Sequence, residues 1–129
     1  MGDGIARRFI DALGRLERRR ELEPMVGLFA DDAGVGNVLV TEGETGPSGT
    51  REFWARYRGS FDALRSEFRN VIEADGRAAL EWTTTGDANG KEVFYDGVSL
   101  LEIEDGKVSR FRAYFDPSDL GEQVTDAVG

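Results

Sequence analysis

The chain has no cysteine and no histidine among its 129 residues. Without cysteine it forms no disulfide, offers no thiolate nucleophile and cannot build a zinc–thiolate site. Without histidine it lacks the side chain that most often serves as a general base. Any proton transfer must therefore use a carboxylate, a lysine or a tyrosine. Because the acidic residues do not cluster in a ligand pattern, we expect no metal and no other cofactor.

Basic residues and long apolar runs are scarce as well. The chain carries 25 acidic and 16 basic residues, with a formal charge of -9 and a pI near 4.5. This charge repels both a phosphate backbone and an anionic lipid surface. No apolar run approaches the ~20 residues of a bilayer span, and MGDGIARRFIDALG lacks the apolar stretch of a signal peptide. We therefore expect a cytoplasmic protein whose partners are neither nucleic acids nor membranes.

The first half of the chain predicts helices, and its length fits one domain over residues 1–129. Apolar residues recur at helical spacing near the start, namely Ile5, Phe9, Ala12, Leu13 and Leu16. Pro24 suits the first turn of a second, short helix. The apolar face of that helix, formed by Met25, Val26 and Phe29, is expected to end near the stretch ADDAG.

A third helix is expected over about residues 50–65. Its apolar side would consist of Phe53, Trp54, Tyr57, Phe61 and Leu64. The preceding segment, TEGETGPSG, is predicted to be a loop because it is rich in glycine and short polar residues. An earlier strand is predicted near VGNVLVT, where it would join an edge of the sheet.

The second half of the chain changes to strand patterns. The dipeptides Asp75-Gly76, Asn89-Gly90 and Asp105-Gly106 are typical of hairpin turns. They separate four predicted strands over residues 67–74, 77–86, 92–104 and 107–115. Helices followed by an antiparallel meander indicate an α+β domain in which the helices cover one face of a curved sheet.

The third predicted strand has apolar residues on both of its faces. One face carries Val93, Tyr95, Leu101 and Ile103, and the other carries Phe94, Val98 and Leu100. The helices can cover only one face of the sheet. We therefore expect a homodimer formed through the outer face, where Tyr114 also lies.

Three motifs resemble the nuclear-transport-factor-2-like superfamily, in particular its SnoaL-like and ketosteroid-isomerase-like branches. They are LFADDAGV after two helices, GPSGTREFWARY at the third helix, and VSLLEIEDGKVSRFRAYFDPSDL near the end. The resemblance spans nearly the whole chain and implies a cone-like fold with a pocket between helices and sheet. Because that fold hosts isomerases, cyclases, epoxide hydrolases, dehydratases and non-enzymatic binders, it does not fix the activity.

The resemblance also shows where catalytic groups of the family are missing. In ketosteroid isomerases the oxyanion-holding tyrosine falls opposite Phe9, and the aspartate base falls opposite Asn37. Their second oxyanion donor, a carboxylic acid, falls near Ser99. Serine can donate a hydrogen bond there but cannot supply the acid.

The second and the last strands of the meander lack charged residues that the relatives carry. Limonene-epoxide-hydrolase-like members have an arginine and an aspartate where this chain has Leu80 and Trp82. Their pocket acid on the final strand falls at Ala113. Asp116, followed by Pro117 in the D-P-S-D pattern, instead has the character of a helix cap.

Strand alternation predicts that one set of side chains lines the pocket. The set consists of Phe9, Asn37, Trp54, Leu80, Trp82, Thr84, Tyr95, Ser99, Phe111, Ala113 and Phe115. Such an aromatic wall with a few neutral donors suits a largely apolar small molecule, for example a polyketide, terpene or steroid-like compound. Tyr95 and Asn37 are the candidates for catalysis, and no partner acid is identified.

Three interpretations of the function stay open at this point. The first is a SnoaL-like enzyme with isomerase- or cyclase-type activity. The second is a non-catalytic ligand-binding protein that has lost the catalytic acids of the family. The third is a dimerisation or interaction module, and in that case large side chains could fill the cavity.

Overall fold

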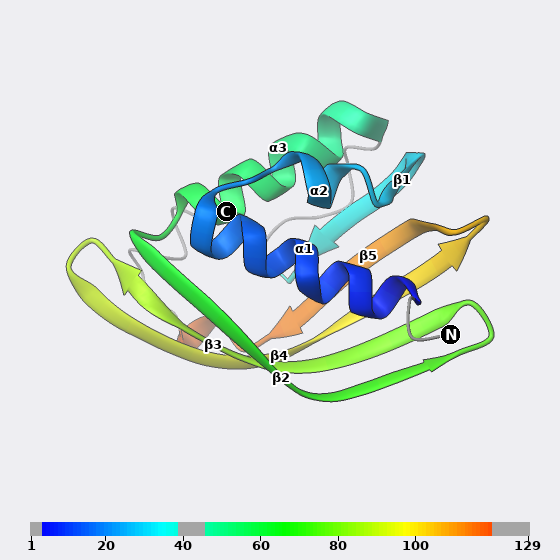
Figure 1. Cartoon of the computed structure of the whole chain (residues 1–129). Helices are drawn as coiled ribbons and strands as arrows, with labels where there is room; N and C mark the ends of the chain where they lie inside the picture. Colours follow the sequence, from blue (N-terminus) through cyan, green and yellow to red (C-terminus); the bar gives the residue numbers. More distant parts are fainter. Residues whose placement is uncertain (1–3, 39–45, 120–129) are drawn as a thin grey trace.

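The computed structural model describes residues 4–38 and 46–119, in which helices lie on the concave side of one curved sheet (Figure 1). The elements in chain order are α1 (Ile5–Arg19), α2 (Glu23–Val26), β1 (Phe29–Asn37), α3 (Gly46–Gly59), β2 (Ala63–Ala74), β3 (Arg77–Ala88), β4 (Lys91–Glu104), β5 (Lys107–Phe115) and the 3₁₀ turn η1 (Pro117–Asp119). This arrangement confirms the predicted α+β, cone-like fold. None of the helices described is long and apolar enough to cross a membrane.

The sheet has the strand order β1-β5-β4-β3-β2. Strands β2 to β5 form the predicted antiparallel meander, and β1 pairs in parallel with β5 at one edge. The three hairpin turns fall at the predicted dipeptides. At each of them both residues have positive φ, for example 52° at Asp75 and 77° at Gly76. Two consecutive positive φ angles match the twist of the flanking strands, which explains why asparagine or aspartate followed by glycine is needed there.

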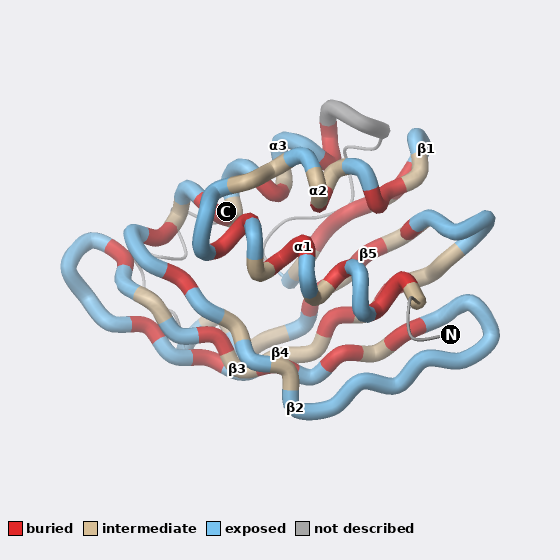
Figure 2. The backbone as a smooth tube through the Cα atoms, in the orientation of Figure 1, coloured by how far each residue is buried: buried red, intermediate tan, exposed pale blue. Residues whose placement is uncertain are grey.

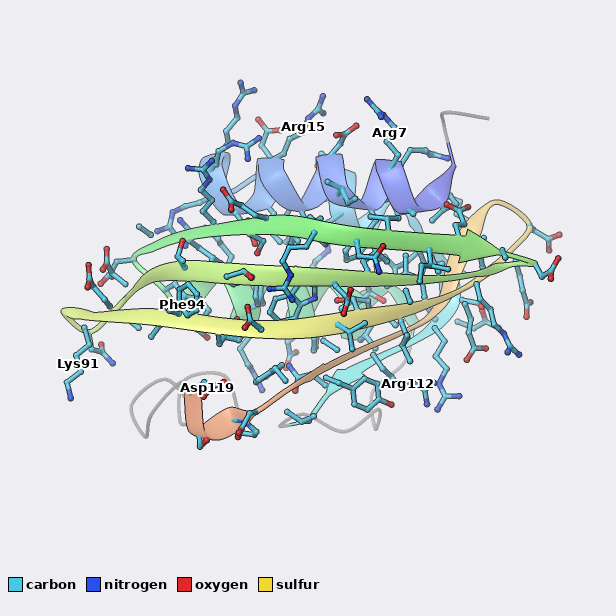
Figure 3. The ribbon with its side chains drawn as sticks, turned by 90° about the horizontal axis from the view of Figure 1, so that it is seen from below. Arg7, Arg15, Lys91, Phe94, Arg112 and Asp119 are labelled. Carbon is cyan, nitrogen blue, oxygen red and sulfur yellow. The ribbon has the colours of Figure 1, made fainter. Side chains whose placement is uncertain are left out.

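Helix α1 buries the predicted apolar stripe against the concave face of the sheet. Arg7 and Arg15 on the opposite side of the helix extend away from the strands (Figure 3). Along β3 and β4, buried residues alternate with exposed or half-buried ones over much of each strand (Figure 2). The core therefore lies between the helices and the concave face, as the strand pattern predicts.

Two helix predictions were wrong in their boundaries. Helix α2 ends at Val26, and Phe29 and the ADDAG stretch belong to strand β1, because this segment pairs with β5. Helix α3 ends at Gly59 rather than near residue 65. Leu64 lies in β2, where it pairs with Gly86 and stays buried.

The predicted loop TEGETGPSG and the predicted strand near VGNVLVT are only partly described. Residues 46–49 open α3, contrary to the loop prediction, and residues 39–45 lie outside the described part of the chain. The strand is present as far as Asn37, and it begins earlier than predicted. Its position at a sheet edge is as expected.

Candidate functional site

A cavity lies between the helices and the concave face of the sheet. Its lining residues come from α1, α3 and all five strands: Phe9, Leu13, Asn37, Phe53, Trp54, Tyr57, Ser66, Trp82, Thr84, Tyr95, Ser99, Phe111, Ala113 and Phe115. The space between the lining atoms is about 520 Å³, which includes space open to solvent. The volume open to the centres of water molecules is only about 40 Å³. The cavity is thus narrow, and a ligand larger than a few water molecules requires the rings around it to move.

The structure brings together all of the predicted pocket residues except Leu80. That side chain is fully buried in the core and does not border the cavity. The sequence-based prediction missed Leu13, Phe53, Tyr57 and Ser66 as lining residues. The helical members of this group could have been found, because Leu13 lies one turn from Phe9 and Tyr57 one turn from Phe53. The role of all these residues in ligand binding stays a prediction.

Aromatic contacts hold the walls of the cavity. On the helix side, the Phe111 ring lies 5.6 Å from the Phe9 ring and 5.0 Å from the Trp54 ring, measured between centroids. On the sheet side, the Tyr95 ring contacts Trp82 at 5.4 Å and Phe115 at 5.3 Å. Each ring is packed edge-to-face, tilted or stacked against others, and these contacts stabilise the walls.

The indole N–H groups of Trp82 and Trp54 differ in their hydrogen bonding. The Trp82 Nε1–H donates to Ser99 Oγ at 2.9 Å, and both residues are buried. The Trp54 Nε1–H is buried without a hydrogen-bond partner in residues 4–38 and 46–119, and Thr50 Oγ1, one turn earlier on α3, is also unpaired. A buried donor without an acceptor costs about 1–3 kcal/mol. A bound molecule with an oxygen near Trp54 would recover that cost.

Sequence reasoning did not find the buried acid of this fold, Glu17 on α1, whose residue is 2% exposed. Its carboxylate accepts three hydrogen bonds, from the Tyr57 hydroxyl at 2.7 Å, the Ser66 hydroxyl at 2.6 Å and the Ser66 backbone N–H at 2.8 Å. The Ser66 hydroxyl also contacts Thr84 Oγ1 at 2.7 Å. Glu17 therefore lies behind the cavity wall and is joined to it by hydroxyl groups that do border the cavity.

Arg58 supports the same region without pairing with the carboxylate. Its Nε donates to the Glu17 backbone oxygen at 3.0 Å, and its Nη1 donates to the Phe61 backbone oxygen at 2.8 Å. The hydrogen bonds to the Glu17 carboxylate itself come from neutral groups, the Tyr57 hydroxyl and the hydroxyl and backbone N–H of Ser66.

The two cavity tyrosines have strongly perturbed acidity. Burial, together with the nearby charge of Glu17, raises the pKa of Tyr95 well above its ordinary value. Burial raises the pKa of Tyr57 as well, and the charge of Glu17 adds to this effect. Both phenols remain neutral near physiological pH. Tyr95 can therefore give or accept a hydrogen bond, but it cannot serve as a base.

Of the other residues discussed from the sequence, Asn37 borders the cavity and Asp116 does not. Asn37 is half-buried at the end of β1 and lines the cavity, and its amide cannot act as a base. Asp116 lies outside the cavity, where its carboxylate accepts hydrogen bonds from the Ser118 backbone N–H at 3.0 Å and hydroxyl at 2.8 Å. These bonds lower the pKa of Asp116. The contacts agree with its interpretation as a cap of the final turn.

Two further acids on β4, Asp96 and Glu102, do not border the cavity. Asp96 pairs with Arg69, and Glu102 lies near Arg110 and Arg112. Hydrogen bonds from Thr83 and Arg69 lower the pKa of Asp96. Within the two described ranges, no three acidic side chains are grouped so that they could hold a metal ion.

Comparisons with known proteins agree with this architecture. The SnoaL-like domain family matches residues 6–111, and the chain belongs to this family. An NTF2-like protein from Anabaena variabilis superposes with a TM-score of 0.80 at 15% identity, covering 87% of each chain. A protein with a ketosteroid isomerase-like fold from Catenulispora acidiphila, in complex with trimethylamine, gives 0.78 at 15% identity, covering 92% of this chain and 95% of that one.

A third solved structure is TerC, co-crystallised with polyporic acid. Its TM-score is 0.74 at 22% identity, over 89% of this chain and 94% of that chain. No curated protein sequence matches the chain. The resemblance that the sequence motifs indicated is thereby confirmed for the family and the fold.

Proposed function

We propose that this SnoaL-like domain binds a small, largely apolar molecule in the cavity between its helices and its sheet. The observation that carries the proposal is the lining itself, in which packed aromatic rings surround a few neutral hydrogen-bonding groups. The unpaired Trp54 Nε1–H favours a ligand with an oxygen acceptor. A polyketide, a terpene or a steroid-like molecule that carries a carbonyl group has this chemistry.

The narrow free space limits the kind of ligand. We expect a flat ring system to fit between the aromatic walls better than a bulky one, because the free space is narrow. The structural neighbour TerC was co-crystallised with polyporic acid, which supports a cyclic ligand of this general kind.

Binding is better supported than catalysis. The described cavity lining contains no carboxylate and no lysine, and both of its tyrosines have raised pKa values. Isomerase- or cyclase-type chemistry needs a group that takes up a proton. The alternative, an enzyme, would have to use Glu17 through the hydroxyl groups that separate it from the cavity. A non-catalytic binding protein requires no such step.

Calorimetric titration tests the binding proposal. The ligands are a panel of two- and three-ring phenols, ketones and hydroxyquinones, and the blocking variant is Ala113→Leu. Ala79→Leu is the matched control, because it adds the same side chain to a half-buried position outside the cavity. We expect at least one compound to bind wild type and Ala79→Leu, and to lose about tenfold or more in affinity with Ala113→Leu. Failure of the whole panel, or equal binding to both variants, would contradict the proposal.

A further inference from the structure

We propose that Glu17 sets the hydrogen-bond polarity of the cavity, so that Tyr57 and Thr84 act as acceptors and select a ligand with a hydroxyl group. The inference rests on the binding function proposed above and names the class of ligand more narrowly. Glu17 does not border the cavity. It is a positioning residue that acts through the groups bonded to it.

The carboxylate of Glu17 fixes the direction of the hydrogen bonds around it. An ionised carboxylate only accepts hydrogen bonds. The Tyr57 hydroxyl, 2.7 Å away, must therefore donate to Glu17, and so must the Ser66 hydroxyl at 2.6 Å. Each of these hydroxyls has a single hydrogen, which is used in that bond.

The Ser66 hydroxyl links Glu17 to Thr84 on the neighbouring strand β3. Because the hydrogen of Ser66 points at Glu17, the 2.7 Å contact between Ser66 Oγ and Thr84 Oγ1 requires Thr84 to donate. Thr84 borders the cavity, and its hydroxyl hydrogen is already used in the bond to Ser66.

A ligand in the cavity meets only hydrogen-bond acceptors at two of the hydroxyl groups that line it. Tyr57 and Thr84 both line the cavity, and each uses its hydroxyl hydrogen in a bond within the protein. Only lone pairs on their oxygens are left. A molecule placed against them gains a hydrogen bond if it brings a hydroxyl group. A molecule that brings only an ether or carbonyl oxygen gains no hydrogen bond, because its lone pairs then face those of the protein.

Replacing Glu17 by glutamine should reverse the chain of bonds. The Ser66 backbone N–H can only donate, so the amide oxygen of the glutamine takes the position of the carboxylate oxygen 2.8 Å from it. The amide NH₂ then takes the other position and donates to the Tyr57 and Ser66 hydroxyls. Ser66 in turn donates to Thr84. The hydroxyl hydrogens of Tyr57 and Thr84 both become free to point into the cavity.

A matched pair of ligands measures this reversal. 2-Naphthol can donate a hydrogen bond, whereas 2-methoxynaphthalene can only accept one. Wild type should bind 2-naphthol more tightly, and Glu17→Gln should shift the affinity ratio toward 2-methoxynaphthalene by about tenfold or more. Glu67→Gln is the control, because it makes the same change at an exposed position on β2. A ratio that is unchanged in a folded Glu17→Gln protein would overturn the proposal.

A second measurement requires no ligand. The intensity ratio of the tyrosine ring doublet in ultraviolet resonance Raman spectra distinguishes a phenol that donates a hydrogen bond from one that accepts. In a background that combines Tyr95→Phe and Tyr114→Phe only Tyr57 contributes, since the chain has three tyrosines. We expect a donor signature in this background and a shift toward the acceptor signature when Glu17→Gln is added.

The two measurements separate the possible failures. An acceptor signature with Glu17 intact would overturn the polarity proposal without any need for the glutamine variant to fold. If neither naphthalene binds to wild type while other compounds of the calorimetric panel do, the predicted hydroxyl selection is wrong. If the whole panel fails and the donor signature is present, the binding function is wrong and the assignment of bond directions is supported.

Discussion

The indole ring of Trp82 lies directly over the backbone of Gly97, its partner across the β3–β4 ladder. A β-carbon at residue 97 would stand 2.4 Å from Cη2 and 2.5 Å from Cζ2 of this ring, and 2.6 Å from the Tyr114 backbone oxygen. Only glycine leaves room for the ring at this position. The contact holds Trp82 where its Nε1–H reaches Ser99.

Gly97→Ala should therefore destabilise the domain. Because the ring, the backbone or both must move, we expect a loss of about 1–3 kcal/mol in the free energy of unfolding, as is usual for overpacked cores. Urea unfolding followed by circular dichroism measures this loss. Gly59→Ala is the control, since a β-carbon there meets no atom within 4 Å. Equal stability of the two variants would show that Trp82 is free to move aside.

Ala113→Asp tests the surroundings of the position where relatives carry an acid. Ala113 is buried on β5, opposite Ser99 on one side and Asn37 on the other. A carboxyl group there loses hydration, which should raise its pKa above the ~3.9 of free aspartate. The cost in stability should be least at low pH, where the group is neutral in both states. It should grow as pH rises through ~3.9, because the unfolded chain then ionises first.

Thermal melts of wild type and Ala113→Asp between about pH 4 and 8 measure this dependence. Ala63→Asp, at an exposed position on β2, serves as the control and should follow the wild-type profile. Superimposable profiles for all three proteins would mean that residue 113 is accessible to water.

The cavity tyrosines should make the domain sensitive to alkali. The pKa values of Tyr57 and Tyr95 are raised in the folded protein, so their contribution to stability is fully present below the unfolded tyrosine pKa of about 10. Above that pH the unfolded chain loses protons that the folded chain keeps, and the free energy of unfolding falls.

Denaturant unfolding at several pH values above neutrality checks this expectation. Tyr95→Phe removes one of the two ionising groups, so its stability should decline less steeply with pH than that of wild type. Parallel declines in the two proteins would contradict the assigned role of Tyr95.

The outer face of the sheet carries the residues on which the expected homodimer depends. Phe94 lies on this face (Figure 3) and is 63% exposed. Tyr114 is also exposed, and Val98 and Leu100 are half-buried. We predict that Phe94→Ser favours the monomer, while Val38→Ser, which alters an exposed apolar residue after β1, does not. Sedimentation at roughly tens of micromolar distinguishes the two states, because a standard-size interface should hold there. A wild-type monomer would refute the dimer.

Local patterns were sufficient to predict most of the fold. The two consecutive positive φ angles at Asp75 and Gly76 are a local requirement, so the dipeptide alone reveals the turn. Strand alternation then assigns Trp82, Tyr95 and Ala113 to one face, and the structure places them around one cavity. Such features depend on neighbours in the sequence, which is why they can be read from it.

Features that depend on distant partners could not be predicted. Glu17 sits among arginines at the end of α1, and nothing in LERRR distinguishes it from a solvated residue. Its bonding partners Tyr57 and Ser66 are 40 and 49 positions away. The ends of α2 and α3 were misjudged for the same reason, since pairing of β1 with β5 and of β2 with β3 decided them.

Both tryptophans of the chain, Trp54 and Trp82, border the cavity. The intrinsic fluorescence of the protein thus originates at the place where we expect a ligand, with no indole elsewhere to add background. The two fluorophores also differ in kind, because the N–H of Trp82 is bonded to Ser99, whereas that of Trp54 has no partner among residues 4–38 and 46–119. Tryptophan fluorescence can therefore report ligand binding without an added label. Replacing either tryptophan by phenylalanine would show which wall a bound molecule contacts.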